Sequence, residues 1–147
     1  MTRNQVAIGV GVRSKKGVLE QLAVLLAIGE EMPASGEIFD ELIARERLGS
    51  TGLGNGVAIP HCRVAELRGP SAAVLTTREA IDFDAMDKAP VNVFFALAVP
   101  VESTQDHLQL LAEMASMCSN ANLLNTLRSE TDLDALLAAL WAWTPSE

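Results

Sequence analysis

The sequence predicts an α/β fold in which one mixed β-sheet of about five strands is flanked by helices on both sides. Of the 147 residues, 49% are apolar, which is enough to bury a core in a single domain spanning residues 1–147. Short runs rich in β-branched residues alternate with longer segments whose apolar residues recur at helical spacing. The run Val91–Val99 is almost unbroken in its apolar character, which is typical of a central strand covered on both faces.

The first third of the chain is predicted to form one strand and two helices. Gln5–Val12 is rich in Val and Ile and predicts a strand. Ser14 can cap a helix from about Lys16 to Glu30, because a serine side chain accepts a hydrogen bond from the first free backbone N–H groups of a helix. Ser35 can cap a second helix in the same way, and Gly49 ends it.

The middle of the chain predicts a loop followed by strands. Residues 49–61 read GSTGLGNGVAIPH, a glycine-rich loop that leads into a short apolar strand, Gly56–Ile59. Ala72–Thr77 is the next predicted strand, and Val91–Val99 is the last.

Three helices are predicted after the last strand. The first begins at Thr104 or Ser103 and continues to about Met117. The other two lie near Leu123–Arg128 and Leu133–Trp143. Thr131 and Asp134 resemble a capping box before the final helix, with Asp in place of Glu.

Charge and composition exclude several classes of function. The chain has 11 Lys and Arg against 19 Asp and Glu, a net charge of −8, so its surface repels nucleic acid. It contains no Tyr and no basic stripe, which argues against a platform for stacking bases. Its apolar runs are too short to span a bilayer, and residues 1–12 lack the layout of a signal peptide. We therefore expect a cytoplasmic protein with no nucleic-acid partner and no membrane insertion.

The two cysteines favour neither a metal site nor a redox motif. Cys62 and Cys118 form no CxxC pair, so two free thiols are expected, although one disulfide is possible. Cys62 follows His61 directly, and neighbours on an extended segment point to opposite faces, which makes them poor joint ligands for zinc. A nucleophilic pair of cysteine and histidine is possible in principle, but no other residue supports it.

His61 is the residue best placed by the sequence for chemistry. It follows Pro60, whose ring fixes its own φ and restricts Ile59 to extended geometry, so the histidine is delivered at a defined position. A neutral imidazole is a good nucleophile toward phosphorus, and glycines let backbone N–H groups approach phosphoryl oxygens. The loop does not match GxxxxGK[ST] or GxGxxG, so binding of ATP or NAD is unsupported. The alternative is a histidine that is simply hydrogen-bonded at the end of a strand.

Two further residues are candidates on weaker grounds. Arg45 lies near the end of the second predicted helix and has a guanidinium that can hold phosphoryl oxygens in a fork. The alternative is a surface ion pair with Glu41, one helical turn away. His107 lies near the start of the third predicted helix and can reach the loop only through the tertiary structure, so a plain helix-face histidine is the alternative.

The segment around His61 carries a resemblance to a known family. ARERLGSTGLGNGVAIPHCRV closely resembles the active-site segment of the enzyme IIA domains of the phosphoenolpyruvate-dependent phosphotransferase system, in the fructose and mannitol branch and closest to its nitrogen-regulatory members. SKKGVLEQLAVLLA, IDFDAMDKAPVNVFFALAVP and DHLQLLAEMA are similar to other segments of this family. The resemblance covers roughly residues 7–140 and implies a mixed β-sheet with helices on both sides.

The resemblance implies a set of roles at the site. His61 would be the phosphorylated histidine, His107 a second active-site histidine that supports it, and Arg45 an arginine near the phosphoryl group, with Arg47 as the neighbouring candidate. Ser50, Thr51, Gly52, Gly54, Asn55 and Gly56 would form the loop around the phosphoryl group. No metal, nucleotide or other cofactor is needed.

Three functions remain open from the sequence. The first is a regulatory phosphocarrier that receives its phosphoryl group from a small histidine phosphocarrier protein and acts on regulatory target proteins. The second is a sugar-uptake component that passes the group to a fructose- or mannitol-specific IIB domain. The third is a binding module that has lost phosphoryl transfer. Two features depart from the family: Cys62 stands where a small residue is common, and the usual leading segment is nearly missing before Gln5.

Overall fold

The computed structural model describes residues 3–29, 32–65, 67–102, 104–129 and 132–142. For residues 3, 104–107, 141 and 142 it describes the backbone only.

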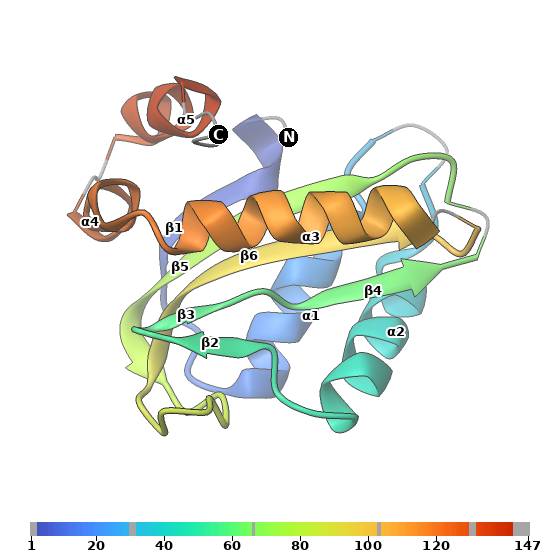
Figure 1. The fold of residues 1–147 in the computed structure, drawn as a ribbon, viewed down its shortest axis with the longest axis horizontal. Coiled ribbons are helices and arrows are strands. Elements are labelled where there is room, and N and C mark those ends of the chain that lie inside the picture. The colour runs from blue at the N-terminus through green and yellow to red at the C-terminus, as the bar shows by residue number, and fades with distance from the viewer. Residues whose placement is uncertain (1–2, 30–31, 66, 103, 130–131, 143–147) are drawn as a thin grey trace.

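A mixed, six-stranded β-sheet forms the middle layer (Figure 1). Its strands are β1 (Val6–Val10), β2 (Gly52–Gly54), β3 (Val57–Ala58), β4 (His61–Val64), β5 (Ser71–Ile81) and β6 (Val91–Pro100). The order is β1-β5-β6-β3-β2, and β4 continues along the same edge of β6 as β3. β5 and β6 are antiparallel, whereas β1 pairs with β5, and β3 and β4 pair with β6, in parallel.

Helices cover both faces of this sheet, as the sequence predicted. Helices α1 (Lys15–Leu26) and α2 (Ser35–Arg47) pack on one face. Helices α3 (Thr104–Cys118), α4 (Ala121–Ser129) and α5 (Leu133–Ala142) lie on the other, where α3 runs across the sheet (Figure 1). A short 3₁₀ turn, Arg3–Gln5, precedes β1.

The central strand β6 contributes to both cores. Phe94, Ala96 and Ala98 point toward the α1 and α2 side, whereas Phe95 and Leu97 point toward the side of α3, α4 and α5. All five residues are buried, and their alternation is the period of two that a strand imposes on its side chains. The prediction that this run is covered on both faces is therefore confirmed.

The start of α1 is confirmed and the start of α2 is corrected. The Ser14 side chain accepts a hydrogen bond from the backbone N–H of Gly17 at 3.0 Å, which caps α1, and this helix ends at Leu26 rather than near Glu30. The cap of α2 is Ala34 and not Ser35, because the backbone N–H of Glu37 already bonds to the carbonyl of Ala34. Ser35 lies within the first turn of α2, and Ala34 offers no capping side chain.

The glycine-rich segment contains more strand than the sequence predicted. β2 and β3 form an antiparallel hairpin, joined by a tight turn at Asn55 and Gly56, whose φ angles are 58° and 78°. Asn-Gly is a preferred pair for a turn in which both central residues have positive φ, so this dipeptide was the missed signal. Pro60 separates β3 from β4, because proline has no N–H for the ladder to β6.

The remaining boundaries differ by a few residues. β5 is longer than predicted and reaches from Ser71 to Ile81. Before α4, the Asn120 side chain accepts a hydrogen bond from the backbone N–H of Leu123 at 3.0 Å. The predicted capping box before α5 involves Thr131, which lies outside the described residues. Among the helices described, none is both long and apolar enough to cross a membrane.

Candidate functional site

His61 is the first residue of β4 and lies against the middle of the sheet. Its backbone is in register with Leu97 of β6. The Leu97 N–H donates to the carbonyl of Pro60 at 3.1 Å, so the residue before His61 is also anchored to the central strand. The strand pairing therefore holds the backbone of His61 at a fixed place at the point where β3 gives way to β4.

A hydrogen bond to the backbone selects the tautomer of the His61 ring. Its Nδ1 lies 2.8 Å from the carbonyl oxygen of Ile59. A carbonyl oxygen can only accept a hydrogen bond, so Nδ1 must carry the proton and donate it. In the neutral ring this leaves the lone pair on Nε2, which becomes the nucleophilic nitrogen.

The environment of His61 favours the neutral ring. Burial lowers the pKa of His61 from its ordinary value of 6.5, because an imidazolium loses hydration inside the protein. The hydrogen bond to the Ile59 carbonyl raises the pKa, the positive charge of Arg45 lowers it and the negative charge of Glu46 raises it, but burial is the largest effect. The ring is therefore neutral and nucleophilic near neutral pH.

A surface hollow of about 420 Å³ brings His61 and Arg45 together. It is lined by Glu41, Ala44, Arg45, Leu48, His61, Cys62 and Arg63. Arg45 belongs to the last turn of α2, and its Nη1 donates to the carbonyl of Gly49 at 2.9 Å. The ion pair with Glu41, which the sequence offered as the alternative for Arg45, is not present in the described part of the chain. The guanidinium has further donors beyond the one that holds Gly49, so it can also bind an anion in the hollow.

Arg47, the neighbouring candidate, lies elsewhere. It lines a separate hollow together with Lys15, Leu19 and Asp84. Since α2 turns by about 100° per residue, two residues along the helix move a side chain to the other side. Of the two arginines, Arg45 is thus the one that shares a hollow with His61.

The six predicted loop residues are spread along the β2–β3 hairpin. At its base, the Ser50 hydroxyl donates to the carbonyl of Phe83 at 2.8 Å, and Thr51 is buried. At its turn, the Asn55 N–H donates to Asp87 at 3.1 Å. Gly52, Gly54 and Gly56 lie between and beside these anchors. Their contact with a phosphoryl group stays a prediction from the resemblance.

Glu46 is a residue near the site that sequence reasoning missed: its charge acts on His61, although its side chain lines the hollow of Lys15 and Arg47. Its carboxylate is buried, with a side-chain exposure of 3%, and accepts two hydrogen bonds from Thr51, one from the backbone N–H at 2.9 Å and one from the hydroxyl at 2.8 Å. Lys15 Nζ lies 3.3 Å from the same carboxylate. A signal existed, because the last turn of a helix disfavours a negative charge and an acidic residue there needs another partner.

His107 lies on α3, in the part of that helix for which only the backbone is described. Its side chain therefore lies outside the described structure, and its proposed approach to His61 stays a prediction.

The cysteines are free, as the sequence predicted, and both are buried. Burial, with a smaller contribution from the negative charge of Glu41, raises the pKa of the Cys62 thiol to about 12. Burial alone raises the pKa of Cys118 to about 12. Since the thiolate is the reactive form, Cys62 is no partner for His61 in nucleophilic catalysis.

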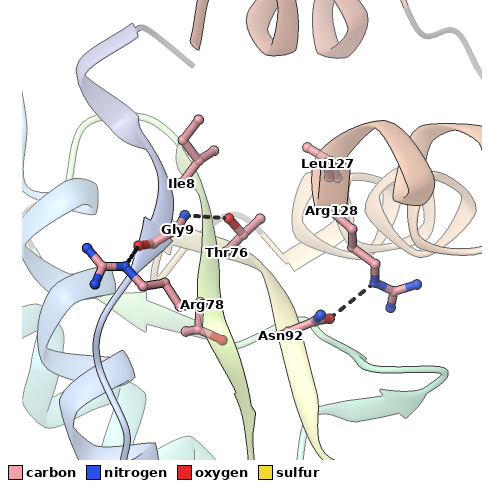
Figure 2. Close-up of a pocket in the computed structure, with 8 residues that line it drawn as sticks. Ile8, Gly9, Thr76, Arg78, Asn92, Leu127 and Arg128 are labelled. Carbon is pink, nitrogen blue, oxygen red and sulfur yellow. Dashed lines mark hydrogen bonds between the residues drawn. The ribbon is translucent and has the colours of Figure 1, made fainter. Parts of the chain in front are cut away.

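A second hollow, of about 310 Å³, lies apart from His61 (Figure 2). It includes Asn92, near the start of β6, whereas the Leu97 partner of His61 lies further along the same strand. Arg128 of α4 donates to the Asn92 side chain at 3.1 Å and also to the carbonyl of Asn55. Arg78 donates to the carbonyl of Gly9 at 2.9 Å, and Figure 2 shows its guanidinium on the other side of the hollow from that of Arg128. These contacts tie α4 to the sheet and strengthen the link between β1 and β5.

The fold and site together define an α/β sandwich with a neutral histidine and an arginine in one hollow, beside a glycine-rich hairpin. Residues 1–142 match the model of the phosphoenolpyruvate-dependent sugar phosphotransferase system, EIIA 2. The chain belongs to this family and is an EIIA component, a phosphoryl carrier of that system.

Proteins of similar sequence and structure support this family assignment. The chain is 46% identical over 138 residues to a nitrogen regulatory protein of Pseudomonas aeruginosa, covering 92% of this chain and 88% of that one. The crystal structure of the nitrogen regulatory protein IIA-Ntr of Neisseria meningitidis has a TM-score of 0.87 and 36% identity, covering 95% and 94%. Enzyme IIAMTL of Escherichia coli, solved in complex with phosphorylated enzyme IIBMTL, has a TM-score of 0.79 at 15% identity, covering 97% and 98%, and so shares the fold.

Proposed function

We propose that this chain is a cytoplasmic regulatory IIA protein that accepts a phosphoryl group on Nε2 of His61 and signals nitrogen or metabolic state through its phosphorylation. The donor is the phosphohistidine of a small histidine phosphocarrier protein. The observation that carries this proposal is the hydrogen bond from Nδ1 of His61 to the Ile59 carbonyl, which presents Nε2 as the nucleophile. The similarity to nitrogen regulatory proteins supports the regulatory role.

The transfer step exchanges one phosphorus–nitrogen bond for another. The Nε2 lone pair of His61 attacks phosphorus while the donor's phosphorus–nitrogen bond breaks, and the donor histidine keeps that electron pair. The proton stays on Nδ1 and keeps its hydrogen bond to the carbonyl of Ile59. This carbonyl stabilises the positive charge that develops on the ring. Arg45 would bind the phosphoryl oxygens, and His107 would support the phosphorylated ring.

The surface beside the site suits a protein donor. Leu48, which lines the His61 hollow, has an exposed fraction of 84%. An apolar side chain in this position can be buried by a partner that docks over the histidine. Phosphorylation would then change the charge of the same surface, so that regulatory target proteins bind one state better than the other.

The alternative function is sugar uptake, in which His61 passes its phosphoryl group to a fructose- or mannitol-specific IIB domain. The fold shared with enzyme IIAMTL, which was solved with its phosphorylated IIB partner, favours this alternative. The two functions use the same chemistry at His61 and differ in the acceptor. A third possibility, a binding module without transfer, predicts that no phosphoryl group is accepted.

The test is the mass of the intact protein after incubation with phosphoenolpyruvate, enzyme I and each candidate phosphocarrier. We expect a single phosphoryl adduct that is stable in base, labile in acid and absent from His61→Ala, while the circular dichroism spectrum of this variant is unchanged. The preferred donor separates the regulatory function from sugar uptake. Absence of an adduct with every active donor would contradict both and leave the binding module.

A further inference from the structure

A continuous series of hydrogen bonds connects Glu46 with the ring of His61. The Glu46 carboxylate accepts from the N–H and the hydroxyl of Thr51 at 2.9 and 2.8 Å. The carbonyl of Thr51 accepts from the N–H of Ile59 at 3.0 Å. The carbonyl of Ile59 then accepts from Nδ1 of His61 at 2.8 Å. Every bond in the series lies within the normal range for a strong contact.

The two middle residues of this series, Thr51 and Ile59, are each held on both sides. Thr51 is bonded to α2 through its N–H and hydroxyl and to the strand side through its carbonyl, so the base of the hairpin cannot shift without breaking a buried hydrogen bond. Ile59 precedes Pro60, which already restricts its backbone to extended geometry. The direction of the Ile59 carbonyl therefore depends on the Thr51 contact at one end and on Pro60 at the other.

Glu46 is itself fixed in place. Its carboxylate lies 3.3 Å from Lys15 Nζ, which also lies 3.3 Å from Asp84 and 4.8 Å from the centre of the Phe83 ring. Helices α1 and α2 and the segment after β5 thus meet at the ammonium group of Lys15. The last turn of a helix is an unfavourable place for a carboxylate, so these contacts, rather than the helix, explain its position.

We infer that Glu46 is a positioning residue for phosphoryl transfer: through Thr51 and Ile59 it holds the His61 ring in the tautomer and orientation that present Nε2. This inference rests on the proposed function. Glu46 acts through other residues, so its loss should lower the rate of transfer without weakening the binding of the donor protein. The negative charge of Glu46 also raises the pKa of His61, which opposes the effect of Arg45.

The test compares Glu46→Ala and Glu46→Gln with the wild type. In Glu46→Ala both Thr51 donors lose their acceptor, and we expect the maximal rate of phosphoryl acceptance to fall on the order of 10- to 100-fold with an unchanged KM for the donor. In Glu46→Gln one carbonyl oxygen remains to accept one of the two bonds, so the loss should be smaller. Glu37→Gln is the matched control, since Glu37 is exposed on the same helix, and it should keep the wild-type rate.

A second readout does not depend on activity. The ¹⁵N chemical shifts of the histidine rings report which nitrogen carries the proton. The wild type should show one His61 tautomer with the proton on Nδ1, and Glu46→Ala should show a mixture. If Glu46→Ala does not fold, Glu46→Gln decides, with a partial shift toward the mixture and a partial loss of rate.

Two outcomes would overturn the inference. One is a folded Glu46 variant with a wild-type rate, whatever its tautomer. The other is a slow variant whose His61 ring keeps the wild-type ¹⁵N shifts, because the loss of rate would then have a cause other than a change in the ring. Failure of the wild type itself to accept a phosphoryl group would refute the proposed function, while the ring shifts would still show whether Glu46 positions His61.

Discussion

Arg45, from the last turn of α2, and His61, from the first position of β4, line the same hollow of the surface. The contact between these two elements creates the site, because neither residue is near the other along the chain. The positive charge of Arg45 lowers the pKa of His61, in the same direction as the larger effect of burial. A guanidinium beside a neutral imidazole is an arrangement in which a phosphoryl group can be both attacked and bound.

Replacing Arg45 should slow phosphoryl acceptance without unfolding the protein. We expect Arg45→Met to lower the maximal rate by about 10²- to 10³-fold, the usual effect of removing one donor that stabilises charge in a transition state. Arg45→Lys should restore part of the rate, because it keeps the charge but loses the forked geometry. Arg47→Met is the control and should behave as wild type, since Arg47 lines a different hollow. Equal losses at both positions would argue against the role of Arg45.

The rate of phosphoryl acceptance should depend on pH through His61. Because the pKa of His61 lies below its ordinary value of 6.5, the rate should be constant from neutral pH upward and fall only when the pH drops below that value. Single-turnover rates and the NMR titration of the ring should give the same midpoint. A rate that already declines between pH 8 and pH 7 would contradict a lowered pKa.

The lowered pKa of His61 also predicts how the stability of the protein depends on pH. When the pH falls through 6.5, the unfolded chain takes up a proton on His61 before the folded protein does, so the free energy of unfolding should decrease until the pH reaches the folded pKa. Urea denaturation at about pH 7.5 and about pH 5 measures the decrease. In His61→Gln the part of the decrease that comes from this residue should disappear; an identical pH dependence in both proteins would contradict the prediction.

Two glycines should respond oppositely to alanine. A Cβ at Gly52 would lie 2.7 Å from the Cβ and 2.9 Å from the Cα of Ala85, which is too close, so Gly52→Ala should lower the free energy of unfolding by about 1–3 kcal/mol. A Cβ at Gly36, in the first turn of α2, meets nothing within 4 Å. Gly36→Ala should raise the stability by about 0.4–1 kcal/mol, because alanine leaves the unfolded chain less freedom. Urea denaturation of both variants tests the pair.

Cys62 should be inert in the folded protein. Since burial raises the pKa of its thiol to about 12, almost no thiolate is present at neutral pH. Intact mass after treatment with iodoacetamide should show no adduct on the native protein and two adducts in urea, where Cys118 is exposed as well. Rapid native labelling of Cys62 would contradict this prediction and show that the wall of the His61 hollow opens.

Much of the fold could be predicted from local sequence patterns. The cap of α1 at Ser14 depends on residues within one helical turn. The two-sided burial of β6 is visible in its unbroken apolar run. By contrast, β2 was missed because a glycine-rich strand has little intrinsic β-propensity and forms through its pairing with β3.

The sequence by itself singled out His61 as the candidate nucleophile, because Pro60 and the strand that precedes it specify where the backbone of His61 goes. It also named Arg45 as the site arginine, with Arg47 as the neighbouring candidate. The tertiary structure places Arg45 in the same hollow as His61 and Arg47 in another, because α2 packs against β4 with only one of the two arginines on that side. Only the tertiary structure showed Glu46, whose contacts with Lys15 and Thr51 join α2 to a second helix and to the base of the hairpin, and such contacts leave no periodic pattern in the sequence.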